Sequence, residues 1–195
     1  TVIYTKNASE SANLLANILR GDKKKIALVG CTEHHSNLLP WQNLFNTIFI
    51  PINNRGELDL DALKKLVTKY RGKIRVIAVT AASNVTGILC PLGLIADLAK
   101  KAGAYLVVDG AQLIAHRPID KKKSGIDFLF FSAHKMYAPF GTGALIGPRA
   151  VMAKADPWQR GGGMIKMVTT DEVVWEDPPA RFEAGTPNVL GAIAL

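Results

Sequence analysis

The sequence is poor in cysteine: only Cys31 and Cys90 occur in 195 residues, which are too few for a framework of disulfide bonds. It also lacks a run of apolar residues long enough to span a membrane, and its first residues show no secretory signal pattern. These shortages exclude a disulfide scaffold and a membrane-spanning chain. We expect a reduced, cytoplasmic protein that does not associate with membranes.

Two common site motifs are also missing. His34 and His35 are adjacent, so they cannot share one helical face as the histidines of an HExxH zinc site do, and we expect no metal site. The glycine-rich segment 157–163 lacks the strand–GxxxxGK[ST]–helix context of a nucleotide-binding loop. We expect this segment to be a flexible loop.

The charge is strongly positive, with a formal net charge of +8. Such an excess can attract nucleic acid or another polyanion. The lysines are scattered, however, apart from the runs 23–25 and 121–123, and no pattern of stacking aromatics accompanies those runs. We therefore expect a solvated surface and no nucleic-acid partner, and keep a polyanion-binding domain as a distant alternative.

Apolar residues make up 48% of the chain, which excludes a disordered protein, and 195 residues suffice for one core. Short apolar runs alternate with segments of helical periodicity, which predicts an α/β fold with a mostly parallel sheet covered by helices on both faces. The expected helices run through 14–19, 38–44 and 59–70 and begin again at 91, whereas 171–179 should be irregular. The expected strands are 2–5, 25–29, 48–50, 75–80, 104–108, 128–131 and 144–146.

Two charged residues follow buried strands. Lys135 comes where the strand 128–131 opens into a loop rich in glycine and proline, and Asp109 ends the strand 104–108. The carboxyl ends of parallel strands are where open α/β sheets bind ligands. An amine and an acid at this edge fit pyridoxal phosphate (PLP): the lysine would hold the aldehyde as an imine, and the aspartate would keep the ring nitrogen protonated. Taken alone, Lys135 fits an exposed turn better than a cofactor site.

Five segments make a resemblance specific. They resemble the class V aminotransferase family, and within it the cysteine desulfurases. The segments are VVDGAQ, which contains Asp109, SAHK, which contains Lys135, TEHHSNLLPW, SNVTG and RFEAGTPN. The likeness covers essentially all 195 residues. It implies the large domain of a PLP-dependent transferase of fold type I, and the family continues into a smaller C-terminal domain. We therefore expect 1–195 to be a single PLP-binding domain of a longer protein.

The resemblance also implies roles for individual residues near the cofactor ring. His34 would cover the face of the ring, Asn84 would lie by the substrate carboxylate and the ring hydroxyl, and Gln112 would bond the ring hydroxyl.

A further set would bind the cofactor phosphate. Ser132 and His134 would contact it, and Ala8 and Ser9 stand where the family has two threonines, so one hydroxyl is missing. In the family the segment matching 157–195 crosses a twofold interface, which implies a homodimer in which Thr186 reaches the partner's phosphate.

The most favoured function from the sequence is cysteine desulfuration, in which cysteine yields alanine and enzyme-bound sulfur that a sulfur-acceptor protein could take. The family's sulfur-accepting cysteine and the arginine that binds the substrate carboxylate lie in the smaller domain, and neither Cys31 nor Cys90 matches that cysteine. A fragment of this extent would not be fully active. The alternatives are a class V aminotransferase, epimerase or lyase, and a non-catalytic module of the same fold.

Overall fold

The computed structural model describes residues 1–20 and 25–195, so Lys23 and Lys24 of the first lysine run lie outside the described residues. The main sheet contains the strands β1 (Val2–Thr5), β2 (Ile26–Gly30), β3 (Asn46–Ile50), β4 (Ile74–Thr80), β5 (Tyr105–Asp109), β6 (Phe128–Ser132) and β7 (Gly143–Ile146). The helices are α1 (Ala8–Leu19), α2 (Leu39–Leu44), α3 (Leu60–Lys69), α4 (Leu92–Ala102), α5 (Arg149–Met152) and α6 (Val189–Ala194). Short 3-10 helices are η1 (His35–Asn37), η2 (Ala133–Met136) and η3 (Ala180–Phe182).

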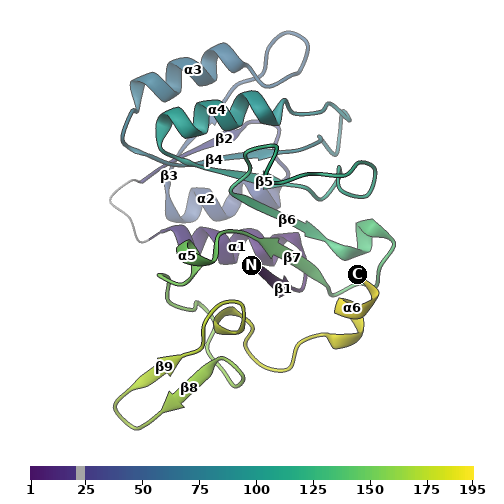
Figure 1. Cartoon of the computed structure of the whole chain (residues 1–195). Coiled ribbons are helices and arrows are strands. Elements are labelled where there is room, and N and C mark those ends of the chain that lie inside the picture. Colours follow the sequence, from purple (N-terminus) through teal and green to yellow (C-terminus); the bar gives the residue numbers. More distant parts are fainter. Residues whose placement is uncertain (21–24) are drawn as a thin grey trace.

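The sheet has seven strands in the order β1-β7-β6-β5-β4-β2-β3. β6, β5, β4, β2 and β3 run parallel, and β7 and β1 add an antiparallel edge. The predicted α/β fold with a mostly parallel sheet is confirmed (Figure 1).

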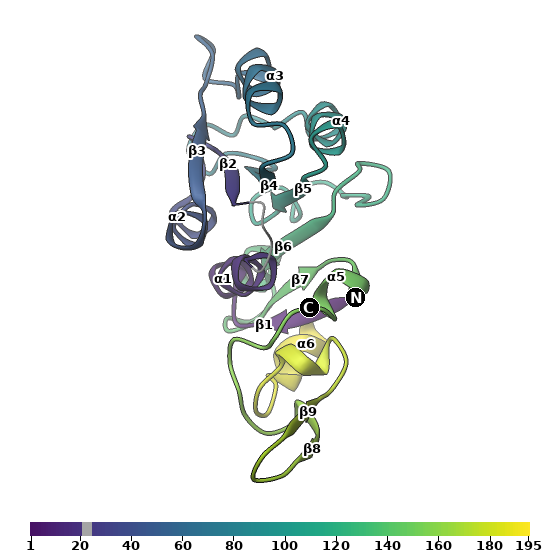
Figure 2. The same ribbon diagram turned by 90° about the vertical axis from the view of Figure 1, so that its left-hand side faces the viewer.

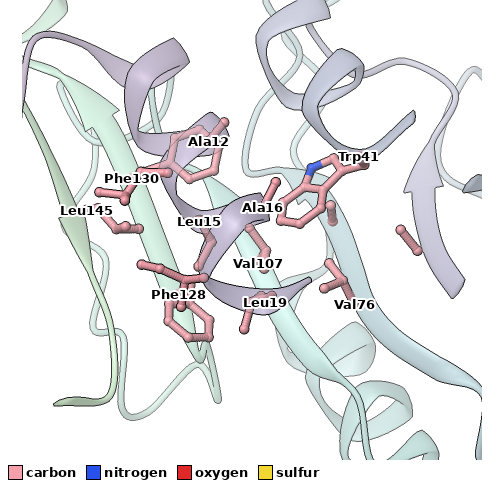
Figure 3. Close-up of a cluster of buried hydrophobic side chains, with 14 of the residues drawn as sticks. Ala12, Leu15, Ala16, Leu19, Trp41, Val76, Val107, Phe128, Phe130 and Leu145 are labelled. Atoms are coloured by element: carbon pink, nitrogen blue, oxygen red, sulfur yellow. The ribbon is translucent and has the colours of Figure 1, made fainter. Parts of the chain in front are cut away.

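Helices cover both faces of the sheet, and the alternation of side chains along each strand explains why (Figure 2). Along β4, Val76 and Ala78 belong to the cluster under α1 and α2, whereas Ile77 and Val79 belong to the cluster under α3 and α4. Figure 3 shows the first cluster, where α1 packs between the strands and Trp41 of α2. The central strands are therefore mostly apolar on both faces, with polar residues such as Arg75 and Asp109 at or near their ends.

Two helix starts are fixed by their capping residues. The Asn7 side chain accepts a hydrogen bond from the Glu10 backbone N–H, and Asp59 caps α3 by accepting from two backbone N–H groups. Asn7 therefore caps α1 and Asp59 caps α3, each satisfying backbone N–H groups that have no partner within the helix.

The segment 171–179 is not wholly irregular, which corrects the expectation from its acidic composition. β9 (Val173–Trp175) pairs antiparallel with β8 (Ile165–Val168) in a hairpin that projects away from the main sheet (Figures 1 and 2). The guanidinium of Arg160 lies 5.6 Å from the centre of the Trp175 ring. Cross-strand pairing and this cation–π contact hold the hairpin.

The connections reverse direction between β2 and β4. The chain leaves β2 through α2 on one face toward β3, and leaves β4 through α4 on the other face toward β5. A crevice for ligands opens at such a switch point, outside the carboxyl ends of the strands. No helix in the described part of the chain is long and apolar enough to cross a membrane.

Candidate active site

A cavity of about 290 Å³ lies at the carboxyl ends of the parallel strands. It is built from the ends of β4, β5 and β6, the loop after β2 and the start of α1. Its lining residues are Asn7, Ala8, Ser9, His34, Ser36, Thr80, Asn84, Asp109, Ala111, Gln112, Ser132, His134 and Lys135. The position agrees with the crevice that the strand order creates.

Asp109 is the buried acid of this cavity, with 4% of the residue exposed. Its Oδ1 accepts a hydrogen bond of 2.8 Å from the Ala111 backbone N–H. Burial raises the pKa of Asp109, while that hydrogen bond and the charges of Lys135 and His34 oppose the rise. Asp109 and Lys135 therefore line one cavity and interact electrostatically, as the predicted pairing of these two residues requires.

The start of α1 forms one wall. The Ala8 backbone N–H donates to Ser132 Oγ at 2.8 Å, and Ser132 itself is 4% exposed. Because Ser132 Oγ accepts this bond, its own hydroxyl proton remains available to a ligand. A helix start and hydroxyl groups together favour an anion at this wall.

A chain of hydrogen bonds orients His34. The Ser36 backbone N–H donates to His34 Nδ1 at 3.2 Å, Ser36 Oγ lies 3.0 Å from the same nitrogen, and Ser9 Oγ lies 2.6 Å from Ser36 Oγ. A neutral imidazole with Nδ1 as acceptor carries its proton on Nε2. Ser36 thus joins the histidine to the helix start.

Lys135 lies on η2, directly after β6. Its neighbour His134 stacks on Phe140, with ring centres 5.4 Å apart and an interplanar angle of 17°. Tyr137 closes η2 with a φ of 61°, a left-handed conformation that non-glycine residues seldom adopt. This turn directs the chain from the lysine into the loop before β7.

The family model described as "Aminotransferase class-V" matches residues 1–195. The chain belongs to the class V aminotransferase family. It is 38% identical over 205 residues to a protein of Vibrio cholerae named "Probable cysteine desulfurase", covering 100% of this chain and 49% of the relative. It is likewise 38% identical over 206 residues to a "Cysteine desulfurase" of Yersinia pestis.

Solved structures agree with this class V assignment. The cysteine desulfurase CsdA from Escherichia coli superposes with a TM-score of 0.93 at 35% identity, over 99% of this chain and 50% of that one. An apo cysteine desulfurase from Thermococcus onnurineus NA1 gives a TM-score of 0.90 at 38% identity, over 99% and 49%. The chain spans about half the length of these relatives.

All but one of the predicted site residues line the cavity that contains Lys135. Those that line it are Ala8, Ser9, His34, Asn84, Asp109, Gln112, Ser132, His134 and Lys135. Thr186 is exposed and lines a different cavity, with Tyr4, Lys6 and Glu10. Its proposed role in a partner's site remains a prediction.

Asn7, Ser36, Thr80 and Ala111 also line the cavity and were not predicted to do so. Thr80 is the last residue of β4, so its place at a strand end was a usable signal. Ser36 stands two residues after His34, a spacing at which a backbone N–H can reach a preceding side chain.

The two cysteines differ in environment. Cys31 is exposed, whereas burial raises the pKa of Cys90 to about 12, with the nearby charge of Glu33 adding to the rise. The Cys90 thiol is therefore a poor nucleophile at neutral pH. Within residues 1–20 and 25–195, no group of three or more His, Cys, Asp or Glu side chains could hold a metal ion.

Proposed function

We propose that this chain is the cofactor-binding part of a PLP-dependent enzyme that acts on an amino acid, with desulfuration of cysteine as the reaction. The observation that carries the proposal is that Asp109 and Lys135 line one cavity together with the start of α1. The names of the relatives, cysteine desulfurases at 38% identity, favour desulfuration over other class V reactions.

The residues present fit this cofactor. A buried acid, an amine, an imidazole and a helix start with hydroxyl groups match its ring nitrogen, its aldehyde, its ring face and its phosphate. Bound PLP supplies an aldehyde that accepts amines and a ring that withdraws electrons from the α-carbon of an amino acid.

Asp109 and Lys135 carry the proton chemistry in this proposal. Asp109 holds a proton at the ring nitrogen. Because the Asp109 carboxyl group is buried, sharing a proton with the ring is more favourable for it than standing as an isolated charge. The Lys135 amine holds the cofactor and, once a substrate amine replaces it, takes or returns the proton at the substrate α-carbon.

The other residues bind and orient. His34 covers one face of the ring and is held by Ser36, while Gln112 and Asn84 supply amide groups for the ring oxygen and the substrate carboxylate. Ser9, Ser132 and His134 donate to the phosphate, and the dipole at the start of α1 favours its negative charge.

A spectroscopic experiment tests the proposal. The purified protein with PLP should show the absorption band of a cofactor joined to a lysine, and Lys135→Ala should lose that band while keeping its circular dichroism spectrum. Lys123→Ala is the matched control, because Lys123 is exposed and its amine lies 3.9 Å from a carboxylate oxygen of Asp120 at the surface. An unchanged band in Lys135→Ala would remove Lys135 from the mechanism.

The products distinguish the alternatives. Desulfuration of cysteine yields alanine and sulfur, which a dithiol reductant releases as sulfide, whereas an aminotransferase yields a keto acid. A non-catalytic module of the same fold predicts no coloured cofactor, and little change when Asp109 is replaced by Ala.

A further inference from the structure

A hydrogen-bond chain runs behind the site, and the proposed mechanism does not use it. Trp41 Nε1–H donates to Asn37 Oδ1 at 3.0 Å, Asn37 Nδ2–H donates to Glu33 Oε2 at 2.6 Å, and the Thr80 backbone N–H donates to Glu33 Oε1 at 2.8 Å. We call these four residues the Glu33 relay. It joins α2, η1, the loop after β2 and the end of β4.

The relay lies directly beneath the residues that face the cofactor site. His34 follows Glu33 in sequence, and the His34 carbonyl accepts a hydrogen bond of 2.8 Å from the Asn37 backbone N–H. Thr80 pairs with Asp109 across β4 and β5, and the Ala81 backbone N–H donates to the Asp109 carbonyl at 2.8 Å. His34 is therefore the neighbour in sequence of one relay residue, and Asp109 is paired with another across adjacent strands.

Groups that can only donate fix which atom donates and which accepts in each hydrogen bond of the relay. An indole nitrogen can only donate, and Trp41 is 0% exposed, so Asn37 must turn its oxygen to Trp41 and its nitrogen to Glu33. A backbone N–H can only donate as well, so Glu33 must accept at both side-chain oxygens. A carboxyl group can do this in its charged and its neutral form, whereas an amide cannot.

The fit around the Glu33 carboxyl is close. A Cβ atom at Gly30, the last residue of β2, would lie 2.6 Å from Glu33 Oε1. Glycine at the end of β2 is therefore what lets the carboxyl fold back against the strand ends and reach β4. The contact places Glu33 at the switch point between β2 and β4, where the ligand crevice opens.

The charge environment agrees with an enclosed acid. Burial raises the pKa of Glu33 to about 8, and the negative charge of Asp109 adds to the rise, while the hydrogen bonds from Thr80 and Asn37 oppose it. Glu33 is then mostly neutral at neutral pH.

We propose that Glu33 is a positioning residue, which acts through the relay to fix the His34 loop and the Asp109 strand end around the ligand. The inference rests on the proposed function for the identity of that ligand, PLP. The relay itself is a statement about this chain alone, so the two can fail separately.

A double-mutant cycle tests the relay by thermal unfolding of the protein without added cofactor. Glu33→Gln should lower the melting temperature by about 4 °C or more, because the new amide nitrogen faces a donor and leaves a buried N–H without an acceptor. In Trp41→Phe the Asn37 amide becomes free to turn round. Its oxygen can then accept from the amide introduced at position 33.

The double variant Glu33→Gln/Trp41→Phe should therefore lose less stability than the sum of the two single losses. Glu57→Gln is the matched control, since Glu57 also accepts from an asparagine, Asn53, at 3.0 Å, but at a partly exposed site where water can substitute. Additive losses in the cycle, or an equal loss in Glu57→Gln, would overturn the relay.

A titration with PLP tests the link to the site. Glu33→Gln should weaken PLP binding about tenfold and shift the absorption maximum of the bound cofactor, and Glu57→Gln should change neither. Gly30→Ala, which displaces the Glu33 carboxyl without removing it, should reproduce the spectral shift. If the cycle shows coupling but these variants bind PLP with unchanged affinity and spectrum, Glu33 does not position the site. Absence of PLP binding by the unaltered protein would instead overturn the proposed function.

Discussion

Individual residues at the carboxyl ends of the strands show how burial tunes two acids. Asp109 and Glu33 are both enclosed, and burial raises the pKa of each, but Asp109 also lies near the cation of Lys135, which favours its charged form. The two carboxyl groups repel each other when both are charged. Their surroundings therefore separate the two acids: Glu33 stays mostly neutral at neutral pH, whereas Asp109 has a cation beside it.

This separation predicts a pH dependence of stability. The pKa of Glu33 rises from 4.5 to about 8 on folding, so its stabilising contribution is fully present below about pH 4.5 and is lost as the pH rises toward 8. The stability gap between the unaltered protein and Glu33→Gln should therefore narrow across this range. Urea unfolding at several pH values measures the gap. The pKa of Asp109 is also raised, but Asp109 is present in both proteins, so its contribution cancels from the stability gap. A gap that stays constant with pH would therefore show that Glu33 does not cause the pH dependence.

The sequence was sufficient for residues that motifs mark and insufficient for residues that only the fold brings together. Asp109 and Lys135 follow apolar strands, so their place at one sheet edge could be predicted. The contact between Glu33 and the Thr80 backbone joins positions 47 residues apart and has no local pattern. Sequence spacing cannot show which buried acid meets which strand end.

At the scale of elements, α1 has a dual task, because its first turn is both a helix start and a wall of the site. Asn7→Ala removes the bond from the Glu10 N–H and should destabilise the protein by about 1 kcal/mol. It should also weaken binding of PLP and of inorganic phosphate, because the first turn frays where the anion binds.

The start of α3 offers a matched control for this prediction. Asp59 caps that helix by accepting from Asp61 N–H and Ala62 N–H, and it does not line the cavity. Asp59→Ala should lose similar stability and keep its affinity for both ligands, measured by thermal unfolding and by calorimetric titration. Equal losses of affinity in the two variants would show that global stability, and not the first turn of α1, controls binding.

Elements with strong periodicity were predictable, and the β8–β9 hairpin was not. Helices α1 and α3 carry apolar stripes and capping residues, so the sequence predicts both. Val173 and Val174 stand among acidic residues, which made the segment look irregular. The strand forms because it pairs with β8, and that pairing is invisible in the segment itself.

At the scale of the whole molecule, the position of Thr186 bears on the proposed homodimer. Thr186 is exposed and lies outside the Lys135 cavity, and the neighbouring helix α6 exposes 82% of Leu190 and 79% of Ile193. Exposed apolar side chains near Thr186 favour a surface that another chain covers. We expect a homodimer in which this segment reaches the partner's site.

A mixing experiment distinguishes action in the partner from action within the chain. Lys135→Ala retains Thr186, and Thr186→Ala retains Lys135, so in a mixed dimer one site receives both residues if Thr186 acts in the partner. Random mixing in equal amounts makes half the dimers mixed, each with one intact site of two, which restores about a quarter of the sites. We expect tight PLP binding to return to that level after the two variants are unfolded and refolded together. If Thr186 acts within its own chain, every mixed site lacks one residue, and tight binding never exceeds the average of the separate variants.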